Sequence, residues 1–338
     1  MKKRATVKDV ASKAGVTIGT VSHVINGTAS ISQETSLRVL TAIEELGYVP
    51  NAAARNIRVK HTKTVGLMVP KMSNSFYARI ASGFMDKAAK EDNYTVLLLS
   101  YEYSLEREKA EIISLIQQNV EAIVIANGYH DEAVVQEALD RDIKVIFVDR
   151  RTSNPDIPYI EYDNRAIYGD VIGFLKEKGY HSIGFISESL SMINLYDRYE
   201  GFMAGMEKHQ YPVCEEHIFI SERFREDHME QGYLFMKKLL NERSKEELPE
   251  AFIASSDLLA LGIIRAMKEK GYQVPGDFGV VGCDDLEISA YMSPSLTTVR
   301  QDRDTLANKM WDITKAAIAG KKVENITLGQ ELIIRESC

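Results

Sequence analysis

A cluster of small and polar residues near the N-terminus has the side chains needed to read DNA bases. On the helix expected there, the exposed positions are Ile18, Gly19, Thr20, Ser22 and His23. Such groups can hydrogen-bond to base edges in a major groove or contact a thymine methyl. Residues 1–63 carry a formal charge of +6 and residues 64–338 carry −14. A basic segment on an acidic body is typical of a chain that touches a polyanion at one end, and a chance excess of surface lysines is the alternative.

Local signals place this cluster on the second of three short helices. The expected helix caps are Thr6 (with Asp9), Thr17 and Ser32, and the expected ends are Gly15, Asn26-Gly27 and Gly47. In the third helix, the apolar residues in register are Leu37, Leu40, Ile43 and Leu46. Two short helices joined by a tight turn and closed by a third form a helix-turn-helix, although any three-helix bundle would contain such a pair.

From Val65 onward, short apolar runs alternate with amphipathic stretches, which predicts parallel sheets with helical crossovers. The expected strands are Val65–Val69, Val96–Leu99, Ala122–Ile125, Lys144–Val148, Ser182–Ile186, Ile218–Ser221, Ala251–Ala254 and Gly279–Gly282. Twice four strands fits two similar lobes, with a boundary near Tyr162–Asn164. Since ligands of open α/β sheets bind beyond the carboxyl ends of strands, the residues that follow each strand are the candidates for a second site. They include 71–77, 127–130, Asp149-Arg150, 187–198, 223–227, Ser256-Asp257 and Asp284-Asp285.

The head closely resembles that of the lactose/galactose-repressor family of bacterial transcription regulators. The resemblance rests on TVKDVASKAGVTIGTVSHVING and ETSLRVLTAIEELGYVPNAAARNI, and it continues through most of the chain. It implies an all-α helix-turn-helix head (1–50) and a hinge helix with its linker (51–63). These precede an α/β two-lobe body (64–338) like the periplasmic sugar-binding proteins, with parallel sheets. Lobe 1 is expected over about 64–162 and 296–322, and lobe 2 over about 163–295 and 323–338.

The same resemblance implies which residues contact DNA. They are Thr6, Thr17, Ile18, Gly19, Thr20, Ser22, His23, Asn26, Asn51, Ala54, Arg55 and Ile57. Ile57 matches a leucine that wedges into the central base step in the family, although isoleucine is β-branched and blunter. The alternatives are a packing histidine at His23 and a passive alanine-rich spacer at 50–57.

In the body, the resemblance implies a small-molecule effector in the cleft between the lobes. Its expected contacts are Asn74, Phe76, Tyr77, Arg150, Asp163, Asn194, Arg198, Phe224, Asp257 and Asp284. Aromatic faces with an arginine and carboxylates suit a sugar-like ligand, and a nucleobase or a sugar phosphate is the alternative. Phe76 and Tyr77 could instead be lobe core, and Arg198 could be paired to an acid for structural reasons.

Motifs for other functions are missing from the sequence. It contains no G-x-G-x-x-G, Walker, H-E-x-x-H, G-x-S-x-G or C-x-x-C pattern, so no catalytic residue, metal site or cofactor is expected. No apolar run approaches the ~18 residues of a membrane helix, and no secretion signal precedes the head, so a cytoplasmic protein without membrane contact is expected. A secreted solute-binding protein would not carry the basic head, and a sugar enzyme would need a catalytic constellation. We therefore expect a repressor that binds a palindromic operator in double-stranded DNA as a homodimer, under the control of the effector.

Overall fold

The computed structural model describes residues 5–26, 29–48, 62–128 and 132–338. The chain divides into two compact units, residues 1–62 and residues 63–338. No helix in the described part of the chain is long and apolar enough to cross a membrane.

The first unit contains α1 (Val7–Ala14), α2 (Ile18–Asn26) and α3 (Gln33–Leu46). The expected cap of α1 is confirmed, since the Thr6 backbone donates to Asp9 at 2.7 Å and the Asp9 backbone donates to the Thr6 hydroxyl. Ser32 accepts from the backbone of Thr35 at the start of α3 as expected.

The buried face of α3 differs from the expectation. Leu37 and Leu40 are 67% and 53% exposed, whereas Val39 and Ala42 are buried in the head core. Ile43 and Leu46 pack partly against the same core. The buried stripe therefore starts at Val39 and follows the i, i+3, i+4, i+7 spacing of a helix, which the pattern of leucines alone did not reveal.

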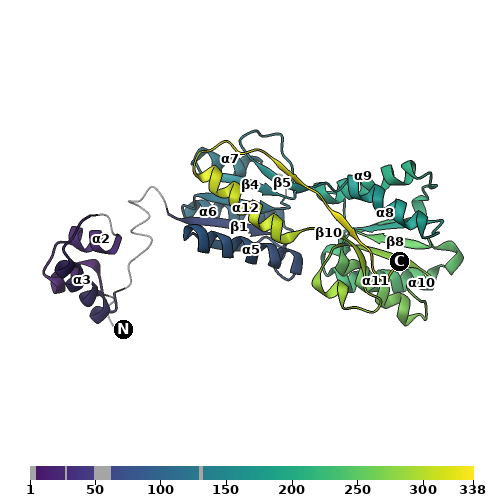
Figure 1. The fold of residues 1–338 in the computed structure, drawn as a ribbon, viewed down its shortest axis with the longest axis horizontal. Helices are drawn as coiled ribbons and strands as arrows, with labels where there is room; N and C mark the ends of the chain where they lie inside the picture. Colours follow the sequence, from purple (N-terminus) through teal and green to yellow (C-terminus); the bar gives the residue numbers. More distant parts are fainter. Residues whose placement is uncertain (1–4, 27–28, 49–61, 129–131) are drawn as a thin grey trace. The chain divides into compact units, whose positions relative to one another are not determined.

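The second unit consists of two lobes, each built on a six-stranded sheet (Figure 1). The first sheet has the order β11-β5-β4-β3-β1-β2 and is wholly parallel. Its strands are β1 (Thr64–Val69), β2 (Thr95–Ser100), β3 (Ala122–Ala126), β4 (Lys144–Val148), β5 (Tyr159–Tyr162) and β11 (Ile326–Leu328). Alternate strand residues face two cores: α5 (Ser75–Asp92) and α12 (Arg303–Ile318) cover one, and α6 (Leu105–Gln117) and α7 (Glu132–Asp140) cover the other. Figure 1 shows α12 beside α5, although more than 200 residues separate them in sequence.

The second sheet has the order β12-β10-β9-β8-β6-β7 and is parallel except for the β10–β12 pair. Its strands are β6 (Ile183–Ser187), β7 (Ile218–Ile220), β8 (Ala251–Ala254), β9 (Gly279–Asp284), β10 (Thr297–Arg300) and β12 (Glu331–Ile333). Helices α8 (Ala166–Glu177) and α9 (Ile193–Lys208) cover one face, and α10 (His228–Glu242) and α11 (Asp257–Glu269) cover the other. Short 3-10 helices lie at Glu215–His217, Glu222–Arg225, Lys245–Glu247 and Glu287–Ala290.

The chain crosses between the lobes three times, after β5, after β10 and after β11. The first crossing lies at the expected boundary, near Tyr162–Asn164. The other two boundaries of the expected lobes were wrong: β10 belongs to lobe 2 although it was placed in lobe 1, and β11 belongs to lobe 1 although it was placed in lobe 2. These strands are only three or four residues long, so their apolar pattern carries little information about which sheet they join.

Candidate functional site

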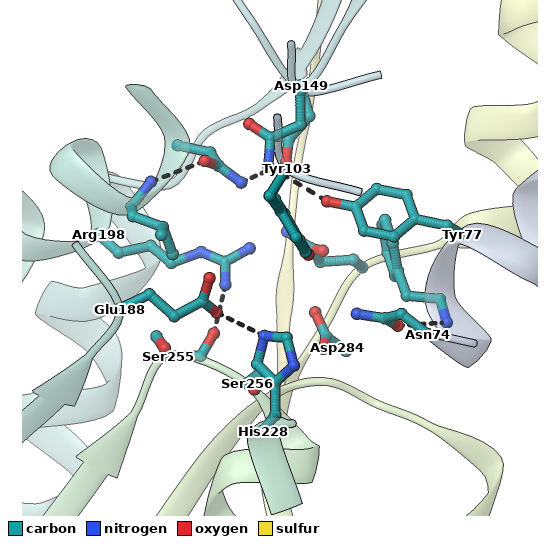
Figure 2. Close-up of a pocket in the computed structure, with 15 residues that line it drawn as sticks. Asn74, Tyr77, Tyr103, Asp149, Glu188, Arg198, His228, Ser255, Ser256 and Asp284 are labelled. Atoms are coloured by element: carbon teal, nitrogen blue, oxygen red, sulfur yellow. Dashed lines mark hydrogen bonds and ion pairs between the residues drawn. The ribbon is translucent and has the colours of Figure 1, made fainter. Parts of the chain in front are cut away.

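Polar side chains converge in a cavity between the lobes, at the carboxyl ends of both sheets (Figure 2). The empty space of the cavity, counted together with its opening to solvent, is about 400 Å³. Lobe 1 contributes the start of α5 and the residues after β2, β3 and β4. Lobe 2 contributes α9, the start of α10 and the residues at the ends of β6, β8, β9 and β10. The lining residues are Asn74, Phe76, Tyr77, Tyr103, Asn127, Asp149, Glu188, Asn194, Leu195, Arg198, His228, Ser255, Ser256, Asp284 and Gln301.

Arg198 is the fixed cation of this cavity and is only 4% exposed. Its Nε donates to Asn164 at 3.0 Å, and its Nη1 donates to the backbone carbonyl of Ser255. With the Gln301 amide turned so that its oxygen faces the guanidinium, Nη2 donates to that oxygen at 2.8 Å. Three of the five N–H groups are thus held by the protein, which fixes the orientation of the guanidinium and leaves two donors for a ligand.

Two buried carboxylates face Arg198, one from each lobe. Asp149 follows β4, and its Oδ2 accepts from the amide of Asn194 at 2.7 Å, while Oδ1 has no hydrogen-bond partner in the described part of the chain. Burial raises the pKa of Asp149, although Arg198 and the amides of Asn194 and Asn164 oppose the rise. Asp284 ends β9, and burial raises its pKa to about 8 against the opposing effect of Arg198. The charge of Arg198 therefore acts on both carboxylates.

A third carboxylate, Glu188, has two cationic partners in lobe 2, His228 and Arg225. His228 lies 2.8 Å from one of its oxygens, and Arg225 lies 3.7 Å from the other. Burial alone would raise the pKa of Glu188, but His228 and Arg225 hold it below its usual value. Conversely, burial opposes the charge on His228, but Glu188 raises the pKa of that imidazole. This cluster also meets lobe 1, since the Arg225 guanidinium lies 6.0 Å from the Tyr103 ring centre.

The aromatic side of the cavity belongs to lobe 1. Phe76 and Tyr77 begin α5 and pack edge-to-face at 5.3 Å. The Tyr77 hydroxyl accepts from the Asn127 amide at 3.2 Å. Both rings belong to the lobe 1 core, and both also line the cavity.

Six of the ten expected effector contacts are brought together here: Asn74, Phe76, Tyr77, Asn194, Arg198 and Asp284. The other four lie elsewhere, and each has a structural reason. Arg150 turns away from the cavity, stacks 4.0 Å from the Phe147 ring and pairs with Glu108 at 3.6 Å.

The remaining three serve the scaffold of the body. Asp163 is exposed and accepts from the backbone of Ala166 near the start of α8. Phe224 is 2% exposed and packs edge-to-face on Phe235 at 5.3 Å. Asp257 is fully buried, and its carboxylate is saturated by protein donors.

Nine lining residues were not among the ten expected effector contacts. Asn127, Asp149, Glu188, Leu195 and Ser256 lie in the candidate ranges after predicted strands, whereas Tyr103, His228, Ser255 and Gln301 were missed. Most of these nine residues lie at or near the carboxyl end of a predicted strand, where ligands of open α/β sheets are expected to bind. Gln301 follows β10, a strand that was not predicted. Tyr103 lies three residues beyond β2, after a strand whose following residues were not considered.

The head presents the expected face of α2. Thr17, Ile18, Gly19 and His23 are exposed, whereas Thr20 and Ser22 are half-buried. The Thr17 hydroxyl accepts from the Thr20 backbone at 3.1 Å, which caps the helix, and Thr6 is exposed at the start of α1. Asn51, Ala54, Arg55 and Ile57 lie outside the described residues, as does the side chain of Asn26.

No group of three or more histidine, cysteine, aspartate or glutamate side chains in the described ranges could hold a metal ion. The cavity instead offers charged and hydrogen-bonding groups around an enclosed space. Such a site suits binding of a small polar molecule.

Known proteins match both parts of the chain. Residues 6–51 match the family described as bacterial regulatory proteins, lacI family, and residues 172–338 match the periplasmic binding protein-like domain. The HTH-type transcriptional repressor PurR of Mannheimia succiniciproducens is 33% identical over 337 residues, which cover 98% of each chain. The PurR repressor of Proteus mirabilis is 32% identical, with 98% of this chain and 96% of that protein covered.

Solved structures resemble the chain over nearly its whole length. The lac repressor dimer bound to operator and the anti-inducer ONPF has a TM-score of 0.84 at 26% identity, with 99% of both chains covered. The complex of the transcriptional regulator CelR with cellobiose has a TM-score of 0.72 at 26% identity, with 99% of this chain and 100% of that chain covered. The chain therefore belongs to the LacI family of bacterial regulatory proteins, and it is a DNA-binding transcriptional regulator with an effector-binding domain.

Proposed function

We propose that this repressor reads a near-palindromic operator as a homodimer, with the exposed face of α2 in the major groove. This proposal is supported by the exposure of Thr17 and His23, whose hydroxyl and imidazole groups can hydrogen-bond to base edges. Two copies of the head then read two half-sites related by twofold symmetry. The structural relative bound to operator is a dimer, which supports this arrangement.

The expected hinge contacts Asn51, Ala54, Arg55 and Ile57 belong to the same proposal. An apolar wedge at Ile57 would open a central base step, at a cost of a few kcal/mol that added contacts offset. Because the protein must reach chromosomal DNA, we place it in the cytoplasm.

The effector-binding site is the cavity between the lobes. The observation that carries this proposal is the buried, polar lining assembled from the carboxyl ends of strands in both lobes. A ligand that touches both lobes stabilises one arrangement of them over another, and this differential affinity is what can regulate operator binding. The expected contacts are Asn74, Phe76, Tyr77, Asn194, Arg198 and Asp284, joined by Asp149. The CelR relative binds cellobiose, which supports a sugar-like effector.

We also infer that the protein is not an enzyme. Two serines, Ser255 and Ser256, line the cavity, but the Ser255 hydroxyl has no partner within the described ranges and that of Ser256 caps α11. The imidazole of His228 is engaged by Glu188. A nucleophile and its base are therefore not paired in this site.

Two linked measurements test the proposal. Selection of duplexes from a random DNA library by the full-length protein should return an inverted repeat, and a sequence without twofold symmetry would contradict dimeric reading. With that duplex, a fluorescence-anisotropy titration should show that a ligand which raises the melting temperature also shifts operator affinity. Substitution of Arg198 with alanine should weaken that ligand at least tenfold, whereas Arg79→Ala, an exposed arginine paired with Asp304, should not.

A further inference from the structure

The cavity is too enclosed for a molecule to reach its interior while the lobes stay as they are. Arg198 and Asp149 are each 4% exposed, and Asp284 is 6% exposed. All three line the space between the carboxyl ends of the two sheets. Entry of a ligand therefore requires the lobes to move apart, and the contacts that join the lobes determine how often this happens.

The connections between the lobes gather at one edge of the body. The chain crosses after β5, β10 and β11, and these strands lie at one side of their sheets. The edge strands at the other side are β2 in the first sheet and β7 in the second. Lobes that swing about the crossings separate most at the edge formed by β2 and β7, which we call the mouth of the cavity.

A short segment of lobe 2 lies at this mouth. The segment, which we call the strap, consists of residues 222–228 between β7 and the start of α10. Its Phe224 ring is 2% exposed and packs against Phe235, which anchors the strap in lobe 2. Glu188 pairs with Arg225 at 3.7 Å and with His228 at 2.8 Å, and Figure 2 shows the second contact. The strap is therefore part of lobe 2.

Two contacts join the strap to lobe 1. Lys71 follows β1, and its Nζ donates to the backbone carbonyl of Glu226 at 2.5 Å. Tyr103 follows β2, and its ring centre lies 6.0 Å from the Arg225 guanidinium. A cation at this distance from an aromatic ring is attracted to it, and the attraction is stronger where water is excluded. The Arg225 side chain is 11% exposed, so this contact is largely shielded from water.

The guanidinium of Arg225 is held in place for this contact by its own lobe. Its Nη2 donates to the Ser189 carbonyl at 3.2 Å and to the Ser191 hydroxyl at 2.9 Å. A group that is already fixed loses little further freedom when the Tyr103 ring approaches, so the contact costs little entropy to form. Lys71 instead contributes a hydrogen bond from a charged donor, which is stronger than one between neutral groups.

We propose that the strap is a latch that holds the lobes together at the mouth in the ligand-free protein, and that ligand exchange requires Lys71 and Tyr103 to release it. Within the described residues, neither Lys71 nor Arg225 lines the cavity, so both act on opening and not on recognition. The inference rests on the proposed function only in treating the molecule that enters as an effector. The opening itself is a property of the ligand-free protein.

Alkylation of a thiol placed inside the cavity measures how often the mouth opens. Ser255 is fully buried and lines the cavity, and its hydroxyl has no hydrogen-bond partner in the described part of the chain, so Ser255→Cys should disturb the site little. The exposed Cys214 is removed by Cys214→Ser, and the buried Cys283 stays as an internal reference for unfolding. Iodoacetamide reacts with the full-length protein without any ligand, and mass spectrometry gives the rate at each thiol. When opening is fast compared with alkylation, this rate is proportional to the population of the open form.

Breaking the latch should expose the introduced thiol. Lys71→Met removes the donor but keeps the carbon chain, and Arg225→Met removes the guanidinium. Each should raise the ratio of the rate at position 255 to the rate at Cys283 at least tenfold. The matched control is Lys176→Met, because Lys176 also donates to a backbone carbonyl, that of His209 at 2.6 Å, but does so within lobe 2. The control should leave the ratio unchanged.

The remaining outcomes decide against the latch. An unchanged ratio in either latch variant would overturn the inference. A rise of both rates by the same factor would overturn it as well, because Lys71 and Arg225 would then only stabilise the fold. Operator affinity is measured separately in the parent chain. If Lys71→Met opens the mouth in a protein whose operator affinity no ligand changes, the proposed function fails and the latch stands.

Discussion

Replacing Arg198 with methionine tests whether one guanidinium holds the interior of the cavity together. Methionine roughly keeps the volume of the side chain but removes its charge and its hydrogen bonds to Asn164, Ser255 and Gln301. Two buried carboxylates then lose their shared counter-charge. A hydrogen bond to a charged group contributes about 1.5–3 kcal/mol, so losing three of them should lower the free energy of unfolding by at least about 3 kcal/mol at pH 8.5.

The loss should depend on pH, and its direction follows from the pKa values. Arg198 lowers the pKa of Asp149 and of Asp284, so its removal raises both further above their unfolded values. A carboxylate whose folded pKa is raised binds protons more tightly in the folded state, so the variant loses stability as pH rises. At pH 5.5 both proteins hold the Asp284 proton, and the cost should be smaller by at least about 1.4 kcal/mol, the equivalent of one pKa unit.

Urea unfolding of the full-length proteins, followed by circular dichroism at both pH values, measures this cost. The matched control is Arg165→Met, because Arg165 is half exposed and pairs with Asp197 at 2.9 Å, outside the cavity. Asp197 is buried but keeps Arg151, which lies 2.7 Å away, so the control should change little. A loss from Arg198→Met below about 1 kcal/mol, or the same loss at both pH values, would refute the account of shared charge.

Three further outcomes are expected. Operator affinity should fall steeply as the salt concentration rises. A fragment of residues 63–338 should no longer bind the operator but should still bind the effector. Operator binding by that fragment would contradict recognition of DNA by the head. Gly262→Ala should destabilise the body by about 1–3 kcal/mol, because the added Cβ would meet the Met229 carbonyl of α10. The control Gly329→Ala has open space around it and should be neutral. Equal melting temperatures of the two variants would refute the close packing of α10 and α11. Ile57→Ala should weaken specific operator binding by about 1–3 kcal/mol and reduce DNA bending, and an unchanged bend measured by gel mobility would limit the hinge to a tether.

Local features of the fold could be predicted from the sequence, and distant pairings could not. The Thr6–Asp9 capping box and the cap at Ser32 depend on residues three apart, so the sequence contains all the information they need. Strands β10 and β11 are short, and the sheet each one joins depends on partners far along the chain, such as the pairing of β11 with β5. Nothing within their own residues specifies that partner.

Much the same limit applied to the site. The rule that ligands bind beyond strand ends located the cavity, but it did not decide which of two adjacent residues faces inward. Asp149 lines the cavity, while its neighbour Arg150 turns toward Glu108 and Phe147. Asp149 has a positive φ of 54°, so the backbone leaves the strand at this residue and strand alternation no longer decides which side chain faces inward; the packing around the strand end does.

A comparison of two buried aspartates explains why we propose Asp284 as an effector contact and Asp257 as a structural residue. Burial raises the pKa of both Asp257 and Asp284, and both lie at the carboxyl end of the second sheet, so neither the titration nor the position separates them. Their donors do. Asp257 accepts hydrogen bonds from the Leu286 backbone and from the hydroxyls of Ser289 and Thr298, so its lone pairs are used by the fold. Within the described part of the chain, Asp284 receives one side-chain hydrogen bond, from Gln301, and lines the cavity with accepting capacity to spare, which is the reason for proposing it as an effector contact.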